Sequence, residues 1–116
     1  MTEADVYPLL AALAGGQVYP YVAPLNAQGE PAVSPPWIVF SMPSENDDDV
    51  MCGQSGASSN SVQIDVYART IDEATSLRSQ AKVALKPLMP TSVMGTKGYE
   101  SDTGLYRATI EVQVWE

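Results

Sequence analysis

The sequence contains no histidine, a single cysteine (Cys52) and only six basic residues in 116. Without histidine, the chain lacks the usual general base and the commonest metal ligand. One cysteine excludes an internal disulfide and a thiolate metal cluster. Six basic against 14 acidic residues give a net charge of -8, which argues against a surface that grips the phosphates of DNA. These absences disfavour an enzyme and a DNA-binding domain.

Long apolar runs are missing as well. No run approaches the roughly 20 residues that a membrane-spanning helix needs, and the acidic start "MTEADVYPLL" differs from a secretory signal peptide. We therefore expect a protein without a membrane anchor that is assembled in the cytoplasm. Hydrophobic residues still make up 45% of the chain, which is enough for one core at this length. We predict a single domain over residues 1–116.

Three segments have clear periodicity. Residues 61–69 and 105–115 alternate apolar and polar side chains, which is typical of half-buried β-strands. Between them, residues 71–86 carry apolar side chains at helical spacing. This helix is preceded by Thr70, which with Glu73 forms the pattern of a capping box.

Weaker patterns surround these segments. "DVYPLLAALAGG" predicts a first helix with Asp5 as its N-cap. "QVYPYV" predicts a short edge strand, because Pro20 has no N–H to donate to a ladder. "WIVFSM" (37–42) is apolar on both faces and predicts a central or covered strand. Residues 91–104 read as a turn-rich connector with a short strand around Tyr99.

Together these elements predict an α+β fold with two layers: a mostly antiparallel sheet of three to five strands, and two helices packed on one face. Two loops, at 22–36 and 43–60, are rich in proline or in serine, glycine and acidic residues, and we expect both to be mobile. The other face of the sheet is expected to be polar, carrying Gln63, Asp65, Tyr67, Arg107, Thr109, Glu111 and Gln113.

Asp65 lies in the middle of a strand, where a carboxylate is either catalytic or on the polar side of the sheet. Its period-two neighbours are polar, which favours a solvated or subunit-facing surface with Arg107 as a cross-strand partner. The candidate residues for a subunit contact are therefore Gln63, Asp65, Tyr67, Arg107, Glu111 and Gln113.

None of the short sequence motifs for metal binding or catalysis is complete. "NDDDV" lacks the glycine and glutamate spacing of an EF-hand. "GQSGA" (53–57) lacks the second glycine of a nucleophile elbow in register, and "SQAK" (79–82) lacks the elements that accompany S-x-x-K in serine acyl enzymes. We predict no catalytic residue, no metal site and no cofactor. The acidic loop remains a candidate assembly site through Glu45, Asp47, Asp48, Asp49 and Met51.

The order of these segments resembles the tail-completion or tail-terminator proteins of long-tailed bacteriophages, also called head–tail joining proteins. The resemblance runs through "VYPLLAAL", "VYPYV", "PPWIVFSM", "VQIDVYARTIDEATSLRSQAKVAL" and "GLYRATIEVQVWE". It covers nearly the whole chain and consists of hydrophobic spacing rather than of invariant residues.

The resemblance implies a structural protein of the virion, at the neck of the tail, assembled in the host cytoplasm. Such a protein caps the head-proximal end of the tail tube as a hexameric ring. Its partners would be further copies of itself, the tail tube protein and a head-side connector or stopper protein. DNA would pass through the lumen without specific binding, and residues 43–60 would face the lumen or the neighbouring ring.

Two alternatives remain open from the residues themselves. One is a small-molecule-binding α+β domain, with a pocket between sheet and helices and with Asp65, Tyr67 and Arg107 as ligand contacts. The other is a different virion ring protein, either a tube subunit or a head-side connector. A tube subunit should polymerise into open stacks, whereas a terminator should stop at one closed ring.

Overall fold

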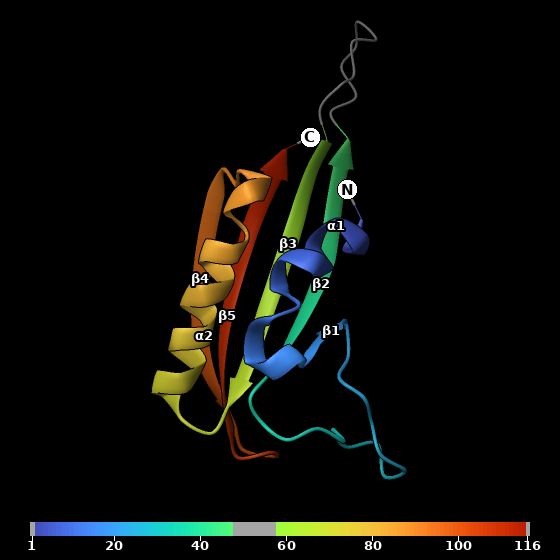
Figure 1. Cartoon of the computed structure of the whole chain (residues 1–116), viewed down its shortest axis with the longest axis vertical. Helices are drawn as coiled ribbons and strands as arrows, with labels where there is room; N and C mark the ends of the chain where they lie inside the picture. Colours follow the sequence, from blue (N-terminus) through green and yellow to red (C-terminus); the bar gives the residue numbers. More distant parts are fainter. Residues whose placement is uncertain (1, 48–57, 116) are drawn as a thin grey trace, which may run out of the picture.

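The computed structural model describes residues 2–47 and 58–115. Figure 1 shows two layers, a twisted sheet and two helices that lie on the same face of it. The elements are α1 (Glu3–Leu10), β1 (Val18–Pro20), β2 (Trp37–Asp47), β3 (Ser58–Ala68), α2 (Ile71–Ala84), β4 (Ser92–Glu100) and β5 (Leu105–Trp115). The strand order is β1-β2-β3-β5-β4, with β1 parallel to β2 and the other neighbours antiparallel. The predicted α+β architecture is confirmed.

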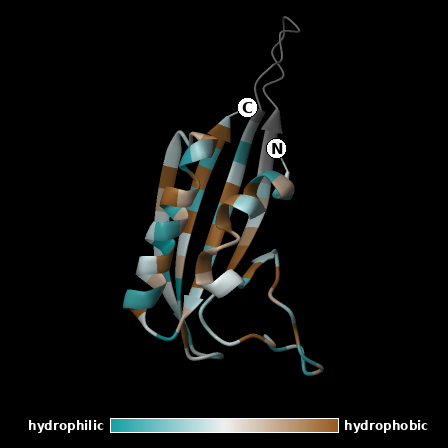
Figure 2. Ribbon diagram, in the orientation of Figure 1, coloured by the Kyte–Doolittle hydropathy of each residue, from teal (hydrophilic) through white to brown (hydrophobic). Residues whose placement is uncertain are grey.

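The core lies between the helices and the central strands. In the central pair, Ile64 of β3 lies opposite Ile110 of β5, and on its other side Ile64 faces Phe40 of β2. All three side chains are buried, and Figure 2 shows hydrophobic residues recurring along these strands. The period-two pattern of the sequence therefore places one continuous apolar surface under the helices.

The second helix follows its prediction closely. Thr70 is its N-cap, and the Thr70 hydroxyl accepts a hydrogen bond of 3.1 Å from the Glu73 N–H. Ala74, Leu77 and Ala81 recur at helical spacing and are buried against the sheet. The cap and the apolar stripe together fix where α2 begins and which side it turns to the core.

The first helix begins earlier than predicted. Thr2 is its N-cap, and the Thr2 N–H donates to Asp5 Oδ2 at 2.8 Å. Asp5 is therefore the third helical residue, where a carboxylate satisfies the N–H of the N-cap residue from inside the first turn. The helix ends at Leu10, before a separate 3₁₀ segment at Leu13–Gly16.

The hairpin of β2 and β3 is longer than predicted. Residues 43–47 were expected in a loop, but β2 continues to Asp47, and β3 already begins at Ser58. The pairing shifts register between Ser41 and Ser44, so β2 contains a bulge. These polar residues have no strand pattern of their own, and pairing with the neighbouring strand holds them in the ladder.

The connector predicted at 91–104 is largely a strand. β4 pairs with β5 from Ser92 to Glu100, although Gly95 and Gly98 weaken its strand pattern. A Cβ at Gly95 would lie 3.1 Å from Arg78 Nη1, which donates to the Thr96 carbonyl oxygen at 3.1 Å. Because Gly95 has no side chain, Arg78 of α2 can reach over the edge strand. The periodicity of the sequence gives no sign of this contact.

The proline-rich loop at 22–36 has internal order. Asn26 Oδ1 accepts hydrogen bonds from the N–H groups of Gln28 and Glu30, and a β-bridge joins Leu25 to Pro31. The loop lies at the end of the sheet away from the β2–β3 hairpin (Figure 1). Its expected mobility, like that of residues 43–60, stays a prediction.

Candidate functional site

The candidate site is the face of the sheet that α1 and α2 do not cover, which we call the outer face. The register of β3 and β5 sets three pairs of candidate residues side by side along it: Gln63 opposite Glu111, Asp65 opposite Thr109, and Tyr67 opposite Arg107; Gln113 follows opposite Ser61. Arg107 is exposed and the other five candidates are half-buried. The predicted polar row therefore exists as one surface.

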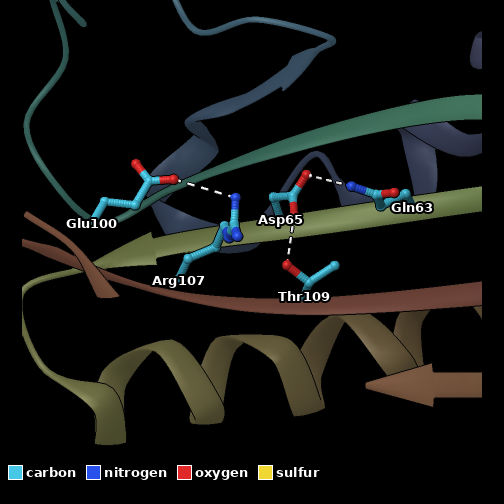
Figure 3. A network of polar contacts seen from close by, with 5 residues as sticks. All are labelled: Gln63, Asp65, Glu100, Arg107 and Thr109. Carbon is cyan, nitrogen blue, oxygen red and sulfur yellow. Dashed lines mark hydrogen bonds and ion pairs between the residues drawn. The ribbon is translucent and has the colours of Figure 1, made fainter. Parts of the chain in front are cut away.

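Asp65 is held by hydrogen bonds on both carboxylate oxygens. Thr109 Oγ1 donates to Asp65 Oδ1 at 2.6 Å, and Gln63 Nε2 donates to Asp65 Oδ2 at 3.0 Å. Figure 3 shows the carboxylate between these two partners. Because both oxygens already accept hydrogen bonds from neighbouring side chains, the geometry fits a structural polar network on the sheet surface.

The predicted partnership of Asp65 with Arg107 is wrong. The two strands are neighbours, but Thr109 stands directly opposite Asp65. Arg107 is turned toward Glu100, and its Nη1 lies 3.3 Å from Glu100 Oε1 (Figure 3). Both side chains of this ion pair are substantially exposed, so it contributes little to stability.

One end of the outer face is apolar, which the polar-row prediction did not include. Trp37 and Tyr67 stack with ring centroids 5.2 Å apart and planes inclined by 22°. They belong to a second buried cluster with Ala23 and Leu105, packed also against Val33 of the proline-rich loop. The signal in the sequence was "WIVF", which is apolar at both strand parities and therefore implies a cover on each face.

This packing changes the chemistry of Tyr67. Burial raises the pKa of the Tyr67 phenol above its usual value of 10.0, and the negative charges of Glu100 and Asp65 raise it further. The neutral phenol is thus favoured in the folded protein at a pH where an exposed tyrosine begins to ionise.

Two shallow grooves adjoin the aromatic cluster. One, of about 210 Å³, is lined by Asp65 and Tyr67 together with Trp37. Another, of about 590 Å³, lies between the proline-rich loop and the β4–β5 turn, and Glu30, Arg69 and Asp102 supply its charged groups. Arg107 lies opposite Tyr67 on β5 but does not line the groove that holds Asp65 and Tyr67, so that groove is not lined by all three ligand contacts of the small-molecule interpretation.

The acidic assembly site falls partly outside the described residues. The backbones of Glu45 and Asp47 belong to β2, whereas Asp48, Asp49 and Met51 lie in the segment 48–57 that the structure does not describe, as does the motif "GQSGA".

The described residues also bear on metals and membranes. Within 2–47 and 58–115, no group of three His, Cys, Asp or Glu side chains is placed to hold a metal ion. In that same part of the chain, no helix has the length and apolar character to cross a bilayer.

Replacing Thr109 by valine keeps the shape of the side chain and removes the donor to Asp65 Oδ1. We expect the free energy of unfolding to fall by about 1.5 kcal/mol, the lower end of the net value of a hydrogen bond to a charged group, in urea titrations followed by tryptophan fluorescence. Thr96→Val is the matched control, because Thr96 is exposed and lies across from Thr109 on β4. Equal losses in both variants would contradict the assigned role of the Asp65 hydrogen bond.

The raised pKa of Tyr67 predicts a pH dependence at the alkaline end. Above about pH 10, the unfolded chain releases the phenol proton before the folded chain does, so the folded state binds more protons and its stability falls as pH rises through the folded pKa. Urea unfolding at pH 8 and pH 11 should show a smaller loss for Tyr67→Phe than for the wild type. Parallel losses would contradict the prediction.

Comparison with known proteins identifies a family. The chain matches the family described as tail completion protein gp17 over residues 6–116. This match confirms the resemblance to bacteriophage tail-completion proteins that the order of the sequence segments indicated. No curated protein matches the chain.

Proposed function

We propose that this chain, which belongs to the tail completion protein gp17 family, caps the head-proximal end of a phage tail tube as a ring. In this role it stops the growth of the tube and joins the tail to the head-side connector. Membership of the family makes the chain a structural component of the phage tail that interacts with other tail or head components. The match over residues 6–116 is the observation that carries the proposal, since it includes every described strand, the whole of α2 and the second half of α1.

The shape of the subunit supports a protein that joins two different partners. Figure 1 shows the end of β2 and the start of β3 at one end of the sheet and the proline-rich loop at the other. The principal-axis extents are 51 × 30 × 24 Å, so the two ends are separated along the longest dimension. A ring of such subunits would offer one end to the tail tube protein and the other to the connector or stopper protein.

The outer face and the acidic loop are the proposed contact regions. Gln63, Asp65, Tyr67, Arg107, Glu111 and Gln113 form a surface whose polar groups suit contact with a neighbouring subunit of the virion. The second region comprises Glu45 and Asp47 at the end of β2 and the following Asp48, Asp49 and Met51, and we place it at the lumen or against the adjacent ring. Carboxylates at the lumen would repel DNA and let it pass without specific binding.

A terminator should form a closed ring and should stop tube growth. We expect light scattering to give one discrete mass, that of a hexameric ring, over a wide concentration range, with or without magnesium. Added to polymerising tail tube protein, the chain should shorten the tubes in proportion to its concentration, and bovine serum albumin is the control. Indefinite polymer of the chain alone would indicate a tube subunit instead and would contradict the proposal.

The acidic loop is tested by replacing Asp47, Asp48 and Asp49 together with asparagine. With less mutual repulsion, rings should form at lower protein concentration, and with less repulsion of DNA, phage carrying this variant should have lower infectivity. Asp102→Asn, an exposed change on the β4–β5 turn, is the control. Unchanged ring assembly together with unchanged infectivity would dispose of both proposed roles.

A further inference from the structure

The sheet has two open edges. β4 is the last strand on one side and pairs with β5 along all nine residues from Ser92 to Glu100. On the other side, β1 pairs only with Ile38–Phe40 of β2. Among the described residues, the stretch Ser41–Asp47 of β2 has no strand partner on that side. Both edges present backbone groups to which another strand can pair, although in the β2 stretch Pro43 has no N–H to donate and the register shifts between Ser41 and Ser44, so the regular backbone there is Ser44–Asp47.

The β4 edge has few of the features that usually prevent such pairing, although Arg78 of α2 reaches over it and donates to the Thr96 carbonyl oxygen at 3.1 Å. It contains no proline, a single lysine (Lys97) and no shift of register against β5. Natural edge strands are commonly short, bulged or protected by charge and proline. β4 also exposes apolar side chains, with Val93 43%, Met94 63% and Tyr99 58% accessible. A long, straight, partly apolar edge of this kind is suited to a partner strand.

The β4 side of the subunit is basic. Arg78, Lys82 and Lys86 of the α2 region lie beside β4, which itself carries Lys97. Two adjoining hollows of about 280 and 470 Å³ share Lys82 and Val93 in their walls, so a groove runs between α2 and the edge strand. Four of the six basic residues of the chain are gathered at this edge.

The opposite side of the subunit is acidic. Residues 1–68, which include α1, β1 and β2, contain eight acidic residues and no basic one, whereas residues 69–116 contain six of each. The entire net charge of -8 therefore belongs to the first 68 residues. Glu3 lies at the β1 edge, where its Oε2 accepts a hydrogen bond of 2.7 Å from the Tyr21 hydroxyl. Among the described residues, the start of α1 thus carries Glu3 and Asp5 and no basic residue, whereas four basic residues outnumber Asp72, Glu73 and Glu100 on the side of α2 and β4.

The strand directions allow the two edges to meet. Because β2–β3, β3–β5 and β5–β4 are all antiparallel pairs, β4 runs opposite to β2. If neighbouring copies are related by a rotation about an axis parallel to the strands, each strand keeps its direction in every copy. β4 of one copy would therefore run antiparallel to β2 of the next copy. The pairing would continue the pattern that the sheet already has within each subunit.

We propose that copies of this chain join head to tail through these edges. The β4 edge of one copy pairs antiparallel with Ser41–Asp47 of the next copy, and the basic groove between α2 and β4 receives the acidic start of α1 from that copy. The contact is heterologous: each copy uses its β4 edge toward one neighbour and its β2 edge toward the other, which is the type of contact that closes a ring. Backbone hydrogen bonds between the added strands would supply the affinity, and the opposite charges would select the correct edge. This inference rests on the proposed ring and names the surface that builds it.

Charge exchange tests the contact. Lys82→Glu with Lys97→Glu makes the β4 edge acidic, and Glu3→Lys with Ala4→Lys makes the α1 edge basic while retaining the Asp5 hydrogen bond to Thr2. Each pair sets like charges against each other, and we expect the concentration for half-assembly of the ring, measured by light scattering, to rise about tenfold or more. The variant with all four changes restores opposite charges, and it should assemble near the wild-type concentration.

The matched control reverses an equal charge elsewhere. Arg69→Glu with Ser101→Glu and Thr103→Glu changes the net charge by the same amount as Lys82→Glu with Lys97→Glu, at exposed positions of the β3–α2 and β4–β5 turns that do not line the groove between α2 and β4. It should leave ring assembly unchanged. The fourfold variant contains every change of both double variants. If it assembles, the weaker ring assembly of the double variants is not caused by a failure to fold.

The outcomes separate this contact from the proposed function. Rings of wild-type mass from both paired variants at the wild-type concentration would overturn the contact and leave the terminator role standing. A fourfold variant that stays unassembled, with wild-type circular dichroism, would also overturn the contact. A wild-type chain that stays monomeric even when mixed with tail tubes would overturn the ring itself.

Discussion

The pairing of β3 with β5 is the interaction on which the rest of the structure depends. Its register places Ile64 opposite Ile110 on the helix side and Asp65 opposite Thr109 on the outer side. Because strand side chains alternate with a period of two, a slip by one residue would exchange the two faces. The same ladder therefore supports the core under α1 and α2 and assembles the polar network. A change of this register would therefore disrupt the core and the polar network of the outer face together.

That network is better suited to holding a surface than to performing chemistry. Asp65 is occupied by two neighbouring donors, and Arg107 is directed to Glu100 at the margin of the sheet. The adjoining Trp37–Tyr67 stack closes one end of the outer face under the proline-rich loop. The outer face is therefore covered at one end and polar along the rest of β3 and β5.

The distribution of charge is as informative as its amount. An acidic chain alone indicates a surface that does not retain DNA. The excess of negative charge belongs to the first 68 residues, and in the fold four of the six basic residues gather around α2 and β4. A subunit with complementary sides and open sheet edges has the asymmetry that a closed head-to-tail assembly needs. The family of tail completion proteins is consistent with such an assembly.

The sequence by itself determined the elements whose patterns are local. Alternation identified β3 and β5, helical spacing with the Thr70 cap identified α2, and the polar row of the outer face followed from the same alternation. It also indicated the family, because hydrophobic spacing along nearly the whole chain is a property of the sequence.

Only the tertiary structure decided the features that depend on distant partners. β4 exists because β5 pairs with a segment containing Gly95 and Gly98, and β2 reaches Asp47 because β3 pairs with it. Thr109, rather than Arg107, is the partner of Asp65, because register sets which side chain stands opposite. Hydrogen bonds and contacts between strands far apart in the chain have no periodicity to reveal them, so local patterns cannot predict them.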